Sequence, residues 1–242
     1  MVPYPFMDNV KPTLVFTLMY LICVLYLGPM WMKNRKPFVL RTPLLIYNLS
    51  MVSASCWLLA NMTRACWWLY ISKLVEYCDT FFFVLRKKGR QINFLHVFHH
   101  ASVPITAWFG VNYGPSGFSM IFPTVNCFVH IWMYLYYGLS ALGPEMQKYL
   151  CWKKYLTSLQ LMQFLFVIIY FLQLYIFPKE GCEVSPFLFF LSTGQAVLYL
   201  VLFANFYLKL YSKGTHKYTI NCVKTSDCIA NGQRTMPKKK EN

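Results

Sequence analysis

Long uncharged runs constrain this chain more than any other feature of its sequence. A helix needs roughly 20 apolar residues to cross a bilayer. Five runs reach that length, at residues 12–32, 42–63, 91–144, 155–178 and 184–208. The longest holds a Gly-Pro-Ser-Gly turn at 114–117, which predicts two helices there. With the apolar segment 65–85, the sequence predicts an all-α polytopic membrane protein with seven transmembrane helices.

Lysine and arginine are distributed unevenly around these predicted spans. The chain carries 23 of them and a formal net charge of +15. Most lie in the first, third and fifth connections and after the last span. Cytoplasmic loops hold the excess of Lys and Arg, so the N-terminus is predicted to be lumenal or extracellular and the C-terminus cytoplasmic. This distribution explains the positive charge without a nucleic-acid partner.

The sequence predicts two unequal parts, a seven-helix membrane domain at residues 1–211 and a tail at 212–242. The tail is polar, basic and without helical periodicity, which is typical of disorder. It ends Lys239-Lys240-Glu241-Asn242, which resembles the dilysine retrieval signal of endoplasmic reticulum membrane proteins. The alternative is a solvated cluster of charge.

The nine cysteines show no metal-ligand spacing, and most lie within apolar spans, where a thiol behaves as a small hydrophobe. Cys182 differs because it falls in a predicted lumenal loop, which is an oxidising environment. Cys66, at the other lumenal turn, is its predicted disulfide partner.

The segment KLVEYCDT places ionisable groups inside an apolar helix, where they are costly and usually functional. Lys73, Glu76, Asp79 and Thr80 follow at helical spacing and share one face. Lys73 and Glu76 are expected to pair, which leaves Asp79 to accept a hydrogen bond from another group. A self-neutralising ion pair alone does not explain Asp79.

Histidines form a second polar stripe in FLHVFHH, where His96, His99 and His100 stand at i, i+3 and i+4. A single buried histidine is usually structural, but three on one face of an apolar helix indicate function. In NCFVHIWMYLYY, Asn126 and His130 are one turn apart.

Two more groups of residues extend the predicted polar interior. Met133, Tyr134 and Tyr137 continue the stripe of His130 along the same helix. In TSLQLMQF, hydroxyl and amide groups repeat every three residues, and interhelical hydrogen bonding and ligand binding explain them equally well. These residues are Thr157, Gln160 and Gln163.

Two chemistries use histidines in such a setting. The HxxHH spacing occurs in membrane di-iron enzymes, but these gather histidines from several boxes and this chain has five in total. The second chemistry is metal-free acyl transfer, in which an imidazole acts as nucleophile or general base. The sequence favours acyl transfer over a metal.

The order KLVEYCDT, FLHVFHH, NCFVHIWMYLYY and TSLQLMQF resembles the very-long-chain fatty acid elongase (ELO) family. MKNRKPF at 32–38, YNLS at 47–50 and FFFVLRKK at 81–88 match as well. The resemblance implies a very-long-chain 3-oxoacyl-CoA synthase, which condenses acyl-CoA with malonyl-CoA and releases carbon dioxide and CoA. It also implies six of the seven helices around an acyl tunnel that is closed toward the lumen.

The resemblance further implies roles for these residues, with no bound cofactor and no metal. His99 is expected to carry the acyl group as an acyl-imidazole. Proton handling and orientation are assigned to His130 and His96, and His100 completes the box. Substrate binding or orientation is expected from Lys73, Glu76, Asp79, Asn126, Tyr134, Gln160 and Gln163. Membrane lipid, other enzymes of the elongation cycle and a second copy of the chain are the expected partners.

The chain departs from the family in its second lumenal connection, where Asn61 to Ala65 leave almost no loop. The departure bears on the closed end of the tunnel and on the partner of Cys182. A seven-span receptor or transporter with proton-sensing histidines is a separate hypothesis. A transporter is expected to show internal repeats, and the sequence shows no duplication.

Overall fold

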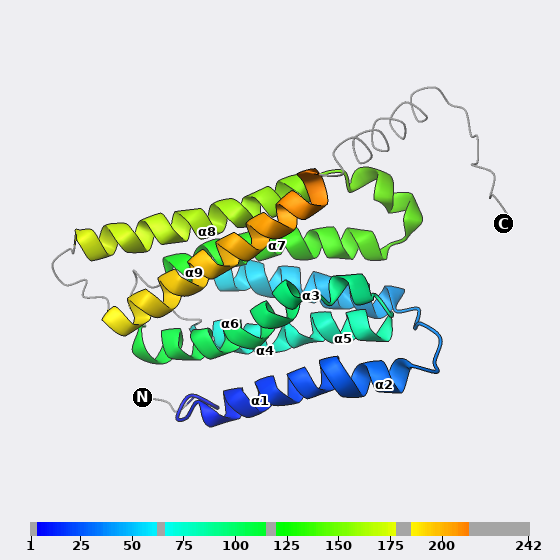
Figure 1. The fold of residues 1–242 in the computed structure, drawn as a ribbon, viewed down its shortest axis with the longest axis horizontal. Coiled ribbons are helices and arrows are strands. Elements are labelled where there is room, and N and C mark those ends of the chain that lie inside the picture. The colour runs from blue at the N-terminus through cyan, green and yellow to red at the C-terminus, as the bar shows by residue number, and fades with distance from the viewer. Residues whose placement is uncertain (1–3, 62–65, 115–119, 178–184, 213–242) are drawn as a thin grey trace, which may run out of the picture.

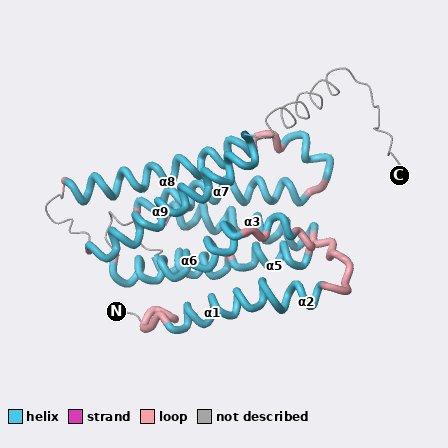
Figure 2. The backbone as a smooth tube through the Cα atoms, viewed as in Figure 1, coloured by secondary structure: helices cyan, strands magenta, loops and turns pink. Residues whose placement is uncertain are grey.

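The structure is a computed structural model that describes residues 4–61, 66–114, 120–177 and 185–212. The predicted tail and the Gly-Pro-Ser-Gly turn beyond Gly114 lie outside the described residues, as does Cys182. All regular structure in the described ranges is helical, and none of it is strand (Figure 2).

The longer helices run roughly along one direction and form a bundle (Figure 1). They are α1 (Lys11–Ile22), α3 (Arg41–Ala60), α4 (Cys66–Val75), α5 (Tyr77–Leu85), α6 (Phe94–Tyr113), α7 (Ile121–Ala141), α8 (Lys153–Ile176) and α9 (Pro186–Tyr207). Shorter pieces are the π-helical turn η1 (Cys23–Leu27), α2 (Gly28–Met32), η2 (Gly89–Gln91), η3 (Pro144–Tyr149) and η4 (Leu208–Ser212). Helix therefore occupies most of each of the seven segments predicted to span a membrane.

Four helical segments are long and apolar enough to cross a membrane, namely Lys11–Met32, Arg41–Ala60, Lys153–Ile176 and Pro186–Tyr207. The helices α6 and α7 are also long, at 20 and 21 residues. Their histidines, asparagines and tyrosines lower the mean hydropathy, so neither qualifies on composition. The helices α4 and α5 are individually too short.

Two local features interrupt the first and third predicted spans. In the first, the turn Cys23–Leu27 is π-helical and Gly28 N–H donates to Cys23 O, one residue further back than in an α-helix. It precedes Pro29, which lacks a backbone N–H. In the third, α4 and α5 meet at Glu76, where Asp79 N–H donates to Glu76 O at 3.1 Å in a tighter turn. The helix over KLVEYCDT is thus divided at Glu76.

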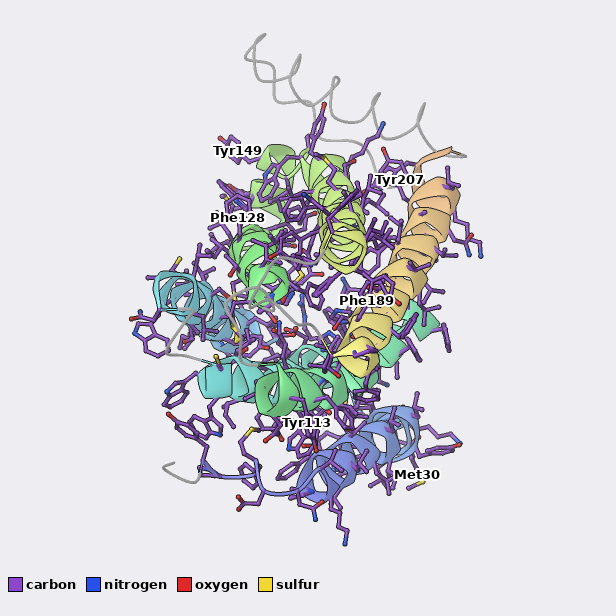
Figure 3. All side chains as sticks on the ribbon, turned by 90° about the vertical axis from the view of Figure 1, so that its left-hand side faces the viewer. Met30, Tyr113, Phe128, Tyr149, Phe189 and Tyr207 are labelled. Carbon is purple, nitrogen blue, oxygen red and sulfur yellow. The ribbon has the colours of Figure 1, made fainter. Side chains whose placement is uncertain are left out.

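Helix contacts follow a closed order, from α3 to α7, α8, α9, α6, α4 and back to α3. The view along the bundle shows these helices around a common centre (Figure 3). The first helical segment lies outside this ring, against α5 and α6. Met30 on α2 is at the periphery of that view and is 69% exposed. The helices of this ring carry most of the polar residues singled out in the sequence, including Lys73 on α4, His99 on α6 and His130 on α7.

Candidate active site

The start of α6 sets the position of the histidines. Asn93 is the N-cap, and its Oδ1 accepts a 2.9 Å hydrogen bond from the His96 backbone N–H. An N-cap of this kind fixes where the first turn begins. Pro104 lies inside the helix and lacks an N–H, so the His100 carbonyl receives no bond from the residue four positions on. The histidine box therefore occupies the first two turns of α6, bounded by Asn93 and Pro104.

The three imidazoles of α6 lie close together. The ring centroids of His96 and His100 are 4.3 Å apart, and those of His99 and His100 are 5.2 Å apart. His100 is buried, and its Nδ1 has no hydrogen-bond partner among the described residues. His96 Nε2 lies 2.9 Å from Thr80 Oγ1. The fold thus brings the α6 histidines into one cluster and connects that cluster to α5.

An ion pair from the turn between α4 and α5 reaches the histidine of α7. Lys73 Nζ lies 2.7 Å from Glu76 Oε1, as the sequence predicted, and both residues are buried. The same carboxylate oxygen lies 3.2 Å from His130 Nδ1. Lys73 Nζ also donates to Asn126 Oδ1 at 2.7 Å. A buried lysine is costly unless it is paired and hydrogen-bonded, and both conditions are met here.

Asp79 accepts a hydrogen bond from another helix, as the sequence predicted. Tyr134 on α7 is fully buried, and its hydroxyl donates a 2.8 Å hydrogen bond to Asp79 Oδ2. The ring of Tyr134 also stands edge-on to that of His130, with centroids 5.7 Å apart. The two carboxylates of KLVEYCDT thus bind different residues of α7, one turn apart.

A narrow, mostly apolar cavity of about 100 Å³ begins at this cluster. Lys73, His99 and Asn126 line one part of it, together with residues of α8 and α9. On α6 its wall runs from His99 to Gly114, which is about 22 Å at the rise of an α-helix. That length exceeds half of the roughly 30 Å hydrocarbon core of a bilayer. His99 is the one histidine of the cluster on the cavity wall.

A second, smaller cavity of about 50 Å³ lies between α3, α5 and α7. Its wall includes Asp79, Arg86 and Asn48, and the ring-bearing residues Phe82 and Tyr137. Arg86 belongs to the basic segment that follows α5. Asp79 therefore lies at the boundary between the polar cluster and this second cavity, whereas its partner Tyr134 lines neither cavity.

The predicted glutamines of α8 are placed differently. Gln163 is buried, and Gln160 Nε2 lies 3.8 Å from the Met133 sulfur. Thr157 Oγ1 donates to Lys153 O within its own helix at 3.3 Å. Gln160 and Gln163 line neither cavity. Of these residues, Gln160 contacts α7, and Thr157 bonds within α8.

Sequence reasoning missed a polar group on α9 beside His99. Tyr199 OH lies 2.7 Å from Ser102 Oγ and accepts a 2.8 Å bond from Gln195 Nε2. The Tyr199 ring centroid is 5.1 Å from that of His99. Ser192, Gln195 and Tyr199 all line the long cavity. Their spacing of i, i+3 and i+7 is the same helical signal that identified the other stripes.

The described ranges contain no group of three or more His, Cys, Asp or Glu arranged to hold a metal ion. The predicted pairing of Cys66 with Cys182 involves a residue outside the described part. Cys66 Sγ itself lies 3.6 Å from the Met120 sulfur.

A helical bundle with apolar spans, a buried histidine–carboxylate cluster and a long cavity defines a membrane protein with an internal polar site. Comparison with known proteins agrees with this class. The ELO (GNS1/SUR4) family matches residues 5–66 and 60–219. The chain is 40% identical over 237 residues to very long chain fatty acid elongase 7 of Drosophila melanogaster, covering 87% of this chain and 71% of the relative.

Two mammalian proteins are similar in sequence to this chain to about the same degree. Very long chain fatty acid elongase 7 of Rattus norvegicus is 38% identical over 236 residues, covering 86% of this chain and 83% of the relative. Very long chain fatty acid elongase 5 of Bos taurus is 39% identical over 233 residues, covering 86% and 76% respectively. The chain therefore belongs to the ELO family and is a multi-pass membrane protein.

Proposed function

We propose that this protein is the condensing enzyme of fatty acid elongation. It joins a long-chain acyl-CoA to malonyl-CoA and releases a 3-ketoacyl-CoA, carbon dioxide and CoA. One observation carries the proposal: His99 lies on the wall of an apolar cavity, beside Lys73 and Asn126. In this proposal the cavity holds the acyl chain, and the imidazole of His99 meets its carbonyl carbon. The elongase names of the relatives support the same reaction.

Asn126 is oriented for this chemistry by its partner. Lysine has three donors and no acceptor, so the amide atom that faces Lys73 Nζ at 2.7 Å is the oxygen. The amide NH₂ of Asn126 is consequently free to donate elsewhere, and Asn126 lies on the cavity wall. We assign it to the thioester oxygen. A preorganised donor there stabilises the negative charge that develops in the transition state.

The reaction proceeds in two stages in this proposal. A nitrogen of His99 attacks the thioester carbon, the N–C bond forms, the C–S bond breaks, and the ring proton passes to the departing thiolate. Malonyl-CoA then loses carbon dioxide, and the electron pair of that bond forms a carbanion that attacks the acyl carbon. The N–C bond breaks, and a proton taken up from solvent restores the imidazole.

Other members of the cluster orient the reacting groups. His130 is held by Glu76 at 3.2 Å and His96 by Thr80 at 2.9 Å, which suits both for proton handling. His100 completes the cluster, and Tyr134 holds Asp79, which lines the second cavity. Arg86 on that wall is suited to attract the phosphates of a CoA ester. The acyl chain and the CoA group therefore occupy opposite sides of the cluster.

The membrane arrangement belongs to the same proposal. Seven spans cross the endoplasmic reticulum membrane, with the N-terminus lumenal, the C-terminus cytoplasmic and six helices around the acyl tunnel. The contacts of α3, α7, α8, α9, α6 and α4, each with the next and the last with the first, support this ring. The substrates are acyl-CoA and malonyl-CoA, no cofactor is bound, and membrane lipid surrounds the bundle. Other elongation-cycle enzymes and a second copy of the chain are proposed partners.

Incorporation of radiolabelled malonyl-CoA by microsomes tests the condensation over a panel of acyl-CoAs. Wild type is expected to form labelled 3-ketoacyl-CoA, and His99→Ala to lose activity by roughly a thousandfold or more. Ser53→Ala, on the exposed face of α3, is the control and retains activity. The proposal fails if wild type forms no product above vector-only microsomes with any acyl-CoA.

The covalent stage has a separate test. Purified protein is incubated with acyl-CoA alone, and we expect CoA release with an acyl adduct on His99. Absence of the adduct, with CoA release only when both substrates are present, rejects the acyl-imidazole and leaves the condensation intact.

A further inference from the structure

The first helix makes an unusual contribution to the interior for a helix outside the ring. Its buried residues are Thr13, Thr17 and Tyr20, at i, i+4 and i+7, so the face turned to the bundle consists of hydroxyl groups. The neighbouring Leu14, Leu18 and Met19 are exposed. No residue of α1 lines either cavity. The buried hydroxyls of α1 therefore do not contact a ligand in either cavity.

These three hydroxyls each meet a hydroxyl of α4 or α5. Thr13 Oγ1 lies 2.7 Å from Tyr70 OH, and Thr17 Oγ1 lies 2.7 Å from Tyr77 OH. In these two pairs the threonine is on α1, and the tyrosine is on α4 for Tyr70 and on α5 for Tyr77. The third pair is reversed, because Tyr20 is on α1 and Thr80 is on α5, with 2.9 Å between their oxygens.

In the third pair the threonine, Thr80, is on α5, and it also contacts a histidine. Thr80 Oγ1 lies 2.9 Å from Tyr20 OH and 2.9 Å from His96 Nε2, and Thr80 is fully buried. A threonine hydroxyl has one proton and two acceptor lone pairs. A phenol is the stronger donor of the two hydroxyls, so Tyr20 O–H donates to Thr80. The Thr80 proton is then available to His96 Nε2.

We propose that Tyr20 is a positioning residue that acts through Thr80 on His96, fixing the ring proton of His96 on Nδ1. This inference rests on the proposed function of the histidine cluster. The hydrogen bond at one imidazole nitrogen determines which nitrogen carries the proton. Without the Tyr20 hydroxyl, the Thr80 O–H loses the donation that orients and polarises it, so its bond to His96 Nε2 weakens and the ring is held less firmly. The outer helix thereby acts on a histidine to which its own Tyr20 is connected only through Thr80.

Interhelical packing is the competing explanation, because hydroxyl pairs commonly join helices in membranes. The chain provides matched controls for it. Tyr70→Phe and Tyr77→Phe each remove one hydroxyl of the same row without a histidine at its end. The Tyr20 and Tyr77 rings are stacked with centroids 4.3 Å apart, and substitution by Phe retains that stack. Packing alone predicts the same result for all three variants.

The experiment measures kcat and KM of the purified enzyme for condensation, together with its thermal unfolding midpoint. We expect Tyr20→Phe and Thr80→Val to lower kcat roughly five- to tenfold, the effect of one net hydrogen bond. KM for acyl-CoA is expected to stay unchanged, because Tyr20 lies outside the cavity. Tyr70→Phe and Tyr77→Phe are expected to retain wild-type kcat, with unfolding midpoints similar to that of Tyr20→Phe.

Two further variants separate positioning from packing. Thr80→Ser keeps the hydroxyl and is expected to recover most of the activity that Thr80→Val loses. In the Thr80→Val background, Tyr20→Phe is expected to change kcat no further, because the effect of Tyr20 passes through that hydroxyl. The inference is overturned if Tyr20→Phe matches Tyr77→Phe in kcat, or if the two substitutions are additive. If the wild-type enzyme itself shows no condensation, the proposed function is overturned instead.

Discussion

The helices α8 and α9 and the helices α5 to α7 are both apolar, yet they bury different groups. On α8 and α9 the buried residues are mainly Leu, Val and Phe, including the fully buried Val167. On α5, α6 and α7 they include Asp79, His100 and His130. Asp79 and His130 each have a polar partner on another helix. Both α8 and α9 qualify as membrane spans by length and hydropathy, whereas α6 and α7 do not. The helix α5, at 9 residues, is too short to qualify.

This difference teaches that hydropathy finds the helices that face lipid better than those that carry chemistry. A polar group inside a bundle is costly unless another group satisfies it, as Glu76 does for Lys73 and Tyr134 for Asp79. Substitutions on the polar helices are expected to change activity, and substitutions on the outer face of the apolar helices are expected to change little.

The largest effect is expected at the ion pair. Glu76→Gln leaves the Lys73 charge buried without its counter-charge, and breaking a buried pair in this way costs about 3–5 kcal/mol. It also removes the group that holds His130. We expect condensation to be lost and the unfolding midpoint in detergent to fall.

The double variant Lys73→Met with Glu76→Gln removes both charges together. It is expected to recover most of the stability and none of the activity. Recovery of activity in the double variant would show that the pair acts only in folding.

The next largest effect on activity is expected at Asn126, through the loss of its side-chain NH₂ donor. Asn126→Leu is predicted to lower kcat roughly a hundredfold, which is the size of a lost oxyanion donor. Asn112→Leu on α6 is the matched control, because the Asn112 amide donates to Trp108 O in its own helix at 3.1 Å. Equal losses of kcat in the two variants would contradict the assignment of Asn126 to the thioester oxygen.

An effect on product length is expected at Gly110. A Cβ atom added there meets no atom within 4 Å, and Gly110 lines the long cavity. Gly110→Leu is expected to shorten the longest product by one or more condensation cycles. Gly194 on α9 is equally open but lies outside the cavity wall, so Gly194→Leu leaves the product distribution unchanged. Chromatography of the products over a panel of acyl-CoAs distinguishes the two.

The smallest effect is expected on the outer face of α8. Ile169 is 56% exposed, and Ile169→Ala is predicted to change stability by no more than about 0.5 kcal/mol and to leave kcat unchanged. Val167→Ala, two residues away at a fully buried position, is predicted to lower the unfolding midpoint further. A larger effect at Ile169 than at Val167 would indicate that α8 packs against another protein on its outer face.

The sequence alone predicted the helical class, the approximate bounds of the helices and the pairing of Lys73 with Glu76. Charge and helical periodicity are local, so a single chain displays them directly. The sequence did not predict that Tyr134 is the partner of Asp79, nor that Gln160 and Gln163 lie away from the cavities. These depend on how α7 and α8 are rotated in the bundle, which periodicity leaves undetermined.

Tyr20 and Tyr199 illustrate a further reason for missed residues. Both are tyrosines in strongly apolar helices, where an aromatic side chain is usually packing. Their hydroxyl partners, Thr80 and Ser102, belong to helices distant in the sequence. Only the assembled bundle shows that each pair lies next to a histidine.

The central claim is that the polar cluster and the long cavity form one site, with the acyl carbonyl at His99 and the chain directed along α6. An acyl-CoA with a photoreactive group at the end of its chain tests this directly, followed by mass spectrometry of the labelled peptides. We predict labelling near Gly110 on α6 and Leu188 on α9 that unlabelled acyl-CoA suppresses. Labelling confined to lipid-facing residues such as Ile169, and unaffected by the competitor, would contradict the account.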